Sequence, residues 1–353
     1  MTALAAISVL VCAAACSGDD DDESDSPTED ETNASPTGSP SAGPVTVQVE
    51  AGAAEEPVFV RAFLPEDVTV RAGDSVAWTA PAGEHTVSFL GEVEPFPLIV
   101  PEPASPADAV LNPRVVNPEP DPAPAGFDGT FLYNSGLFGG DEGQPPTLTF
   151  TAPGTFEYQC LIHPQMSGTV SVLDDPEGEP PDQSGIDEEA ATQREDYLAE
   201  GQEALAELRA EEPESVAGPN ETTAWQVIAG FSTDHTDVRA FVPETLEIDP
   251  GDTVIWVNQA SEPHTVTFGE PLPLESVETL ANGQVRRVLN PEILNVALGG
   301  FEYIDGEFFH SGLLLENGPL GVRFELLFPN PGRFEYVDSL YFDLMRGVIV
   351  VGD

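Results

Sequence analysis

The chain has 353 residues, and its 63 acidic residues outnumber its 11 basic residues so far that the formal net charge is −52. A surface this negative repels nucleic acid and anionic lipid, so the composition argues against proteins that bind either one through charge. It favours a halophilic, salt-adapted setting, because the Debye length falls to about 3 Å near 1 M salt and acidic self-repulsion is then screened.

The first fifteen residues, MTALAAISVLVCAAA, are small and apolar and precede Cys16. This run is shorter than the roughly 20 apolar residues of a spanning helix, and it is typical of a secretory signal peptide. Its end, AAAC, resembles the bacterial lipoprotein processing box, which implies cleavage before Cys16 and a lipid on its sulfur. We expect residues 1–15 to be a signal peptide. The mature protein would lie on the cell-surface or periplasmic side of the membrane, attached only through Cys16, with plain secretion as the alternative.

Residues 16–44 consist mainly of Asp, Glu, Ser, Thr, Pro and Gly. They offer almost nothing to bury, so we expect a disordered acidic tether. The chain has three cysteines. Cys12 would leave with the signal peptide and Cys16 would be lipidated, which leaves Cys160 as a single free thiol. An exported protein that keeps one unpaired cysteine needs a use for it.

Residues 45–174 show the alternation of β-strands. The segments VTVRAGDSVAW, TFEYQC and GTVSVL alternate apolar and polar residues, and Pro-Gly and Gly-Asp turns separate such segments. Short strands punctuated by turns over about 130 residues predict a Greek-key β-sandwich. A long proline-rich insert precedes the Ser-Gly turn of this block, and it could cover either the site or the neighbouring domain.

Four soft or borderline metal ligands occur in this block. Cys160, His163 and Met166 stand at i, i+3 and i+6 in EYQCLIHPQM, and His85 follows a strand that ends near Trp78. Two imidazoles, one thiolate and one thioether are the set that holds copper in trigonal geometry with a weak axial sulfur. A tight loop between the last two strands would aim three of them at one point. Taken singly, each could be a core or turn residue, but the set in this order predicts a copper site.

Residues 175–222 form an acidic linker between two blocks of similar sequence. Within it, IDEEAATQREDYLAEGQEALAELRAEEPES has helix-forming composition, and four apolar residues are spaced for one helical face: Tyr197, Leu198, Leu205 and Leu208. We expect a helix that packs on or between the domains, with a merely solvated charged helix as the alternative.

Residues 223–353 repeat the first block. VRAFLPEDVTVRAGDSVAW matches VRAFVPETLEIDPGDTVIW, and GEHTVSF, YNSGL and TAPGTFEY recur as EPHTVTF, FHSGL and PNPGRFEY. Arg61 and Arg239 are 178 positions apart, as are Trp78 and Trp256. So many matches in one order indicate gene duplication. The fold class is therefore predicted to be all-β, with two tandem Greek-key sandwiches joined by a partly helical acidic linker.

The second block lacks most of the ligand set. Aligning FEYQCLIHPQM with FEYVDSLYFDL places Asp338 at the cysteine and Tyr341 at the loop histidine, with Leu344 or Met345 at the methionine. His264 alone is retained. Loss of the thiolate removes the copper chemistry, so we expect this domain to bind no type 1 copper and to be structural or partner-binding.

A different metal site in the second block stays open as an alternative. His264, His310 and Asp338 could form a harder site for zinc or Cu(II). We favour instead a hydrogen-bonded turn around the histidine.

The motifs GEHTVSF, NSGLF and FTAPGTFEYQCLIHPQMSGTVSV resemble those of the blue copper proteins, the cupredoxins of the plastocyanin, amicyanin and pseudoazurin type. The loop Cys-x-x-His-x-x-Met, preceded by Pro-Gly-x-Phe/Tyr-x-Tyr and followed by Gly-x-Val, is specific to that family. The resemblance covers both blocks, with the full ligand set in the first. It implies one type 1 copper per chain, held by His85, Cys160, His163 and Met166.

The resemblance also implies that His163 lies near the surface as the port for electrons. Apolar neighbours would then form a weak docking patch for a redox partner protein: Leu161, Ile162 and Pro164.

The function predicted from the sequence is extracytoplasmic electron transfer rather than enzymatic catalysis. Copper oxidoreductases with tandem domains of this kind carry a His-Cys-His step, whereas Gln159 and Leu161 flank Cys160, and five histidines supply few further ligands. The competing interpretation is a copper chaperone, buffer or sensor lipoprotein. Part of a copper oxidoreductase is the remaining alternative.

Overall fold

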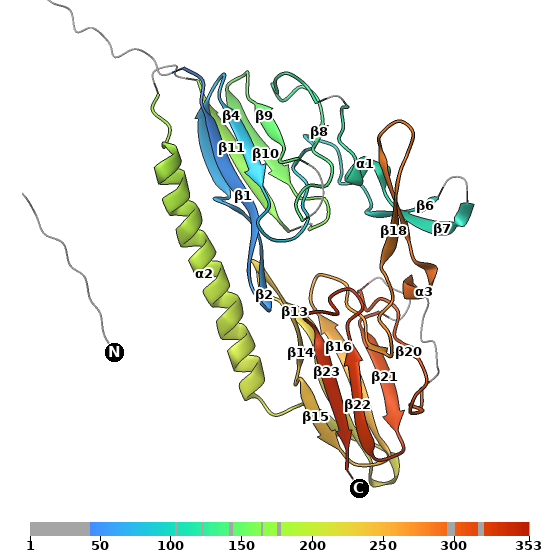
Figure 1. Cartoon of the computed structure of the whole chain (residues 1–353). Coiled ribbons are helices and arrows are strands. Elements are labelled where there is room, and N and C mark those ends of the chain that lie inside the picture. Colours follow the sequence, from blue (N-terminus) through green and yellow to red (C-terminus); the bar gives the residue numbers. More distant parts are fainter. Residues whose placement is uncertain are drawn as a thin grey trace, which may run out of the picture. The chain divides into compact units, whose positions relative to one another are not determined.

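The computed structural model describes residues 43–102, 105–121, 123–140, 144–163, 165–174, 178–294, 301–316 and 321–352. The predicted signal peptide, Cys16 and nearly all of the predicted tether lie outside the described residues. Figure 1 shows strands throughout the described chain, with one long helix beside them. The predicted all-β fold is confirmed.

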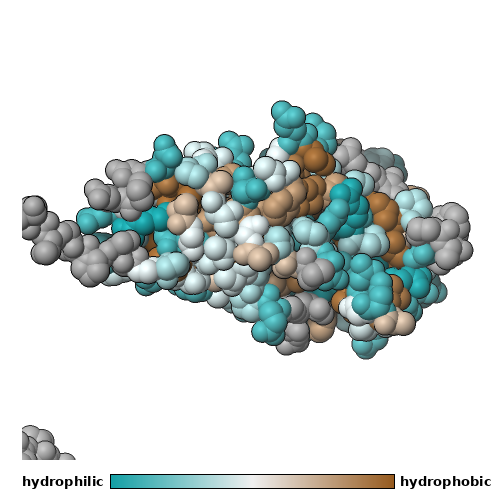
Figure 2. Space-filling view, turned by 90° about the horizontal axis from the view of Figure 1, so that it is seen from above, coloured by the Kyte–Doolittle hydropathy of each residue, from teal (hydrophilic) through white to brown (hydrophobic). Residues whose placement is uncertain are grey.

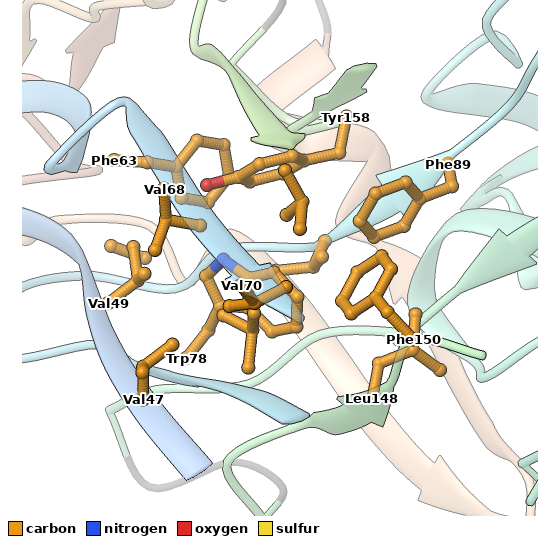
Figure 3. Packing of buried hydrophobic residues seen from close by; sticks show 14 of the residues in the cluster. Val47, Val49, Phe63, Val68, Val70, Trp78, Phe89, Leu148, Phe150 and Tyr158 are labelled. Atoms are coloured by element: carbon orange, nitrogen blue, oxygen red, sulfur yellow. The ribbon is translucent and has the colours of Figure 1, made fainter. Parts of the chain in front are cut away.

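The first sandwich consists of two facing sheets. One has the strand order β2 (Val58–Leu64), β1 (Thr46–Glu55), β4 (Ser75–Thr79) and β9 (Thr147–Thr149). The other has the order β3 (Asp67–Arg71), β11 (Ser167–Leu173), β10 (Gly154–Gln159), β5 (Ser88–Phe89) and β8 (Tyr133–Asn134). Alternate residues of the strands point inward, and the aromatic side chains of Trp78, Phe89 and Tyr158 fill the core between the sheets (Figure 3).

The second sandwich repeats this arrangement strand by strand, as the sequence repeat predicts. Its first sheet has the order β14 (Thr236–Val242), β13 (Thr223–Ser232), β16 (Asp252–Gln259) and β21 (Arg323–Phe328), with β12 (Ser215–Ala217) also paired to β13. Its second sheet has the order β15 (Thr245–Ile248), β23 (Arg346–Val351), β22 (Gly332–Val337), β17 (Thr267–Phe268) and β20 (Phe309–His310). Trp256 and Tyr336 take the places of Trp78 and Tyr158 in its core.

The two sandwiches join through their edge strands. β2 pairs antiparallel with β14, so one sheet runs through both domains: the partners are Val60 with Thr236, Phe59 with Asp237, and Val58 with Val238. Positions 58 and 236 differ by 178, as do 60 and 238, so each repeat contributes the same segment to the joint. Antiparallel pairing of the same segment from both repeats indicates that a local two-fold axis relates the two domains. Pairing also covers two edges that would otherwise be open.

The helix expected in the linker is α2 (Gln183–Ala210), whose N-terminus is capped by Asp182, which accepts the backbone N–H of Gly185 at 3.0 Å. Its buried residues Leu198 and Leu205 belong to the same core cluster as residues of β2 and β14, so the helix lies across the joint (Figure 1). In the described part of the chain, no helix is long and apolar enough to cross a membrane.

The long inserts of the two domains meet in a small sheet of their own. It has the order β18 (Glu275–Thr279), β19 (Val285–Leu289), β7 (Ser105–Leu111) and β6 (Ile99–Glu102), and Val288 pairs with Val110 across the domains. Short helices follow the inserts: α1 (Pro113–Val116) and α3 (Pro291–Leu294), with a 3-10 turn at Pro219–Glu221 in the linker. The first insert thus contacts the neighbouring domain.

Candidate metal centre

The structure brings three of the predicted ligands together at one end of the first sandwich. His85 lies between β4 and β5, Cys160 follows β10, and His163 lies in the loop before β11. The Sγ atom of Cys160 is 3.4 Å from Nδ1 of His163 and 4.0 Å from Nδ1 of His85. The three ligand atoms all lie within 4.8 Å of one another. Among the described residues, no other group of three His, Cys, Asp or Glu side chains is close enough to share a metal ion.

The loop from Cys160 to Met166 is closed by its own backbone. The N–H of Cys160 donates to the carbonyl of Met166 at 2.9 Å, and the N–H of Met166 donates to the carbonyl of His163 at 2.9 Å. The side chain of Met166 is buried in the hydrophobic cluster that also contains Cys160. The fourth predicted ligand therefore lies in the interior at the same end of the sandwich.

Thr86 fixes the cysteine, a role that the metal-ligand pattern of the sequence does not reveal. Its N–H points at Sγ of Cys160 at 3.4 Å, and its hydroxyl accepts the N–H of Leu161 at 2.7 Å. The signal for this role is the His-Thr pair, which occurs in both repeats. In the second repeat Thr265 makes the equivalent contacts to Asp338 and Ser339.

Gly52 makes room for His85 and was also missed. A β-bulge in β1 shifts the register between Ala51 and Ala53, and Gly52 has φ of +73°. A Cβ atom there would lie 2.6 Å from Nε2 of His85 and 2.9 Å from the carbonyl oxygen of Ala82. That carbonyl accepts Nε2–H of His85 at 2.9 Å, which leaves Nδ1 free to face Cys160.

The electrostatics of the site favour a thiolate. Burial alone would raise the pKa of Cys160, but the charge and hydrogen bond of His163, together with His85, hold it well below the usual range. Burial alone would lower the pKa of His163, yet Cys160 and Glu262 raise it to about 10.

The donor set fits a trigonal metal ion. Bonds of about 2.3 Å to sulfur and 2.0 Å to nitrogen, typical of zinc in proteins, would separate the two donor atoms by about 3.7 Å at a trigonal angle. The two sulfur-to-nitrogen distances, 3.4 and 4.0 Å, lie on either side of this value. Thiolate, imidazole and thioether together are the donors that suit copper.

His163, for which the resemblance implies a position near the surface, is only partly exposed. Its side chain is 13 % exposed, and its Nε2 atom lies 3.3 Å from Oε1 of Glu262 in the second domain. Leu161, expected in a docking patch, is buried with Leu90 and Val115. Pro164 lies outside the described residues. Glu262 of the second domain thus lies against His163, whereas Leu161 is covered by residues of the first domain.

The corresponding place in the second sandwich is closed by a direct contact between side chains. Oδ2 of Asp338 lies 2.7 Å from Nδ1 of His264, and both side chains are fully buried. The N–H of Asp338 donates to the carbonyl of Met345 at 3.0 Å, which identifies Met345 as the counterpart of Met166. The carboxylate therefore takes the ring nitrogen that would otherwise face a metal.

His310 is separate from that pair. Its Nδ1 atom contacts the hydroxyl of Thr267 at 2.9 Å, and its Nε2 atom contacts the carbonyl of Ile293 at 3.4 Å. In the first domain Asn134 reaches the short helix α1 in the same way, through its amide and the carbonyl of Val115. His310 thus anchors α3.

No protein-family model matches the chain, and no curated protein matches it. Among solved structures, the chain is similar to the purple cupredoxin from Nitrosopumilus maritimus, with 24% identity, coverage of 36% of this chain and 98% of that chain, and a TM-score of 0.22. It is similar to auracyanin A, a blue copper protein from Chloroflexus aurantiacus, with 25% identity, coverage of 37% and 100%, and a TM-score of 0.22. It is also similar to oxidised plastocyanin from Dryopteris crassirhizoma, with 15% identity, coverage of 36% of this chain and 99% of that chain, and a TM-score of 0.21.

Proposed function

We propose that the protein is an extracytoplasmic one-electron carrier of the cupredoxin type, with a single type 1 copper in the first domain. His85, Cys160 and His163 would hold the metal, with Met166 as a weaker fourth donor. The observation that supports this is the buried sulfur of Cys160 with two imidazole nitrogens directed at it. Bound copper would supply the one-electron couple, because thiolate and thioether stabilise Cu(I) and imidazole serves both oxidation states.

The protein's own residues supply a rigid, dry site. Cys160 and Met166 are almost completely buried, and the loop that carries them is closed by backbone hydrogen bonds. A preformed site changes little when one electron moves, which suits a carrier. A chaperone or buffer needs an open site from which copper can leave.

The decisive measurement is the visible absorption spectrum of the full chain loaded with Cu(II) at high salt, with copper counted per chain. We expect an intense orange-red band and one copper per chain, and loss of the band in Cys160→Ser. Two coppers, one of them colourless, would favour a copper oxidoreductase. Rapid loss of copper to a competing chelator would favour the chaperone or buffer. A chain without colour would contradict the proposal.

We also propose that the protein is exported and lipid-anchored at Cys16, which fits the AAAC sequence before it. Labelled fatty acid should be incorporated by the wild-type protein and not by Cys16→Ala. Equal labelling of both proteins would contradict the anchor.

A further inference from the structure

A carboxylate from the second domain lies against the metal centre of the first. Glu262 lies between β16 and β17, and its Oε1 atom is 3.3 Å from Nε2 of His163. The other ring nitrogen, Nδ1, faces Sγ of Cys160 at 3.4 Å. The imidazole is therefore held from both sides, by a sulfur of one domain and a carboxylate of the other.

Glu262 is itself fixed by three neighbours. Arg239 binds it with two nitrogen atoms, Nε at 3.1 Å and Nη2 at 3.0 Å, and Tyr341 donates its hydroxyl to Oε2 at 2.8 Å. The amide of Asn258 donates to its backbone carbonyl at 2.8 Å. The guanidinium carbon of Arg239 lies 3.8 Å from the ring centre of Phe59 and 4.2 Å from that of Tyr341. Burial alone would raise the pKa of Glu262, but Arg239 and the other donors hold it well below its usual range.

One of these neighbours, Tyr341, stands where the second repeat lacks the loop histidine. Tyr341 follows Asp338 by three residues, as His163 follows Cys160. Its hydroxyl donates to the same carboxylate that contacts His163. Tyr341, which stands at the position of the loop histidine in the second repeat, thus helps to orient the carboxylate that contacts His163.

A second contact holds the same end of the first sandwich against the other domain. Arg287, in the insert of the second domain, binds Glu84 through Nη2 and Oε1 at 2.6 Å. Glu84 precedes the ligand His85 but contacts no ring nitrogen in the structure described. It therefore supplies a matched comparison for Glu262.

We propose that Glu262 is a positioning residue for His163, and that the second domain serves as a fixed cap on the metal-binding end of the first. The carboxylate accepts Nε2–H, which fixes the tautomer that leaves Nδ1 for the metal and makes that nitrogen a stronger donor. This inference rests on the proposed function, because the metal is the copper proposed above. It also gives the second domain a role without a metal of its own.

The first test is the reduction potential of the copper-loaded full chain. Glu262→Gln keeps the size and an acceptor oxygen but removes the charge, so Cu(II) should lose about tenfold in affinity relative to Cu(I). That change corresponds to a rise of about 59 mV for a one-electron couple. Tyr341→Phe should shift the potential in the same direction by less.

Glu84→Gln is the control, because it removes one negative charge and one contact between the domains beside the other histidine. We expect its shift to be less than half that of Glu262→Gln. Equal shifts in the two variants would mean that only the nearby charge matters, and would overturn the positioning role.

A zinc-loaded sample separates this inference from the proposed function. In nitrogen-15 NMR spectra the Nε2–H of His163 should exchange slowly with water in the wild type and in Glu84→Gln, and at least tenfold faster in Glu262→Ala, which leaves no acceptor oxygen at this position. Protection without a copper band would defeat the proposed carrier and leave the positioning role standing. A copper band with equal exchange in all three proteins would overturn the positioning role and leave the proposed carrier standing. A chain that binds neither metal would overturn both.

Discussion

An imidazole that binds a metal through one nitrogen needs the other nitrogen held, and the two histidines of the proposed site are held in different ways. His85 donates to the carbonyl of Ala82 within its own loop. His163 faces a carboxylate of the other domain. The first arrangement depends on Gly52, because any Cβ at that position would overlap the ring of His85.

We therefore expect Gly52→Ala to weaken copper binding. The backbone at φ of +73° would cost about 1–2 kcal/mol with a side chain, and the clash would displace His85 in addition. Titration of the visible band should show at least a tenfold loss of affinity. Gly73→Ala is the control, since Gly73 has φ of +100° but nothing within 4 Å of its Cβ position. It should lower the free energy of unfolding and leave the band unchanged, and a loss of copper from both variants would refute the steric role.

His310 gives a prediction on pH. Burial lowers the pKa of this side chain below 6.5 in the folded protein. The unfolded chain, with an ordinary pKa of about 6.5, therefore takes up a proton first as the pH falls, so stability decreases below that pH. His310→Asn, which copies Asn134 of the first domain, removes this proton. Urea unfolding should show that the difference in free energy of unfolding between the two proteins changes between pH 7.5 and 5, by at most about 1.36 kcal/mol per pH unit. A constant difference would contradict the prediction.

The ligand types and their loop spacing were visible in the sequence because they are local. Cys160, His163 and Met166 lie within one loop, and His85 lies in a motif that both repeats share. Glu262 was not found, although it stands in the quoted segment EPHTVTF where the first repeat has Gly83. Its role depends on the contact between domains, which no spacing in the sequence specifies.

At the scale of elements, α2 binds the two sandwiches together at the joint of β2 and β14. Gly201 lies at the middle of this contact. A Cβ there would be 2.5 Å from Val58 of β2 and 2.7 Å from Thr236 of β14, which are equivalent positions in the two repeats. The helix therefore approaches both domains along a line that only glycine permits.

We expect Gly201→Ala to destabilise the protein, although alanine favours a helix by about 1 kcal/mol over glycine. The added methyl would force α2 away from Val58 and Thr236 and open the packing of Leu198 and Leu205. Gly185→Ala in the same helix is the control, because its Cβ would meet only Pro181 at 3.5 Å and Asp182 at 3.8 Å. Urea unfolding should show a lower midpoint for the first variant and an equal or higher one for the second. An equal rise of the midpoint in both variants would show that helix propensity, and not the contact with β2 and β14, determines the effect.

The strands of each sandwich were predictable because period-two alternation is a local signal. The joint was not, because the pairing of β2 with β14 depends on which edges are left open once each sandwich has formed. The pairing in the insert sheet was not predictable either. Among the described residues, Val288 and Val110 are the one strand pair across the domains there, and neither insert has a sequence pattern that specifies its partner.

At the scale of the whole molecule, several of the rare positive charges lie where the two domains or the linker helix meet. Of the 11 arginines, three form ion pairs that link the first domain to the second: Arg61 with Asp237, Arg286 with Glu102, and Arg287 with Glu84. Arg239 pairs with Glu262 inside the second domain, and its guanidinium lies over the ring of Phe59 of the first. Arg194 of α2 pairs with Glu50 of β1. The face drawn in Figure 2 carries many hydrophilic residues with smaller hydrophobic areas between them. The excess carboxylates are thus left mainly to repel one another at the surface.

This distribution predicts that the protein becomes more stable as salt is added. Surface repulsion is screened strongly between 0.1 and 1 M NaCl, whereas the buried pairs at the joint, such as Arg61 with Asp237, are screened much less. The free energy of unfolding should rise by about 1–3 kcal/mol, the sum of several surface interactions of 0.2–1 kcal/mol each. Urea is the denaturant of choice because it carries no charge. At pH 4, where many carboxylates are neutral, the same salt should have a smaller effect. A salt effect that is equally large at both pH values would assign the stabilisation to ion exclusion from the surface rather than to screening of the net charge of −52.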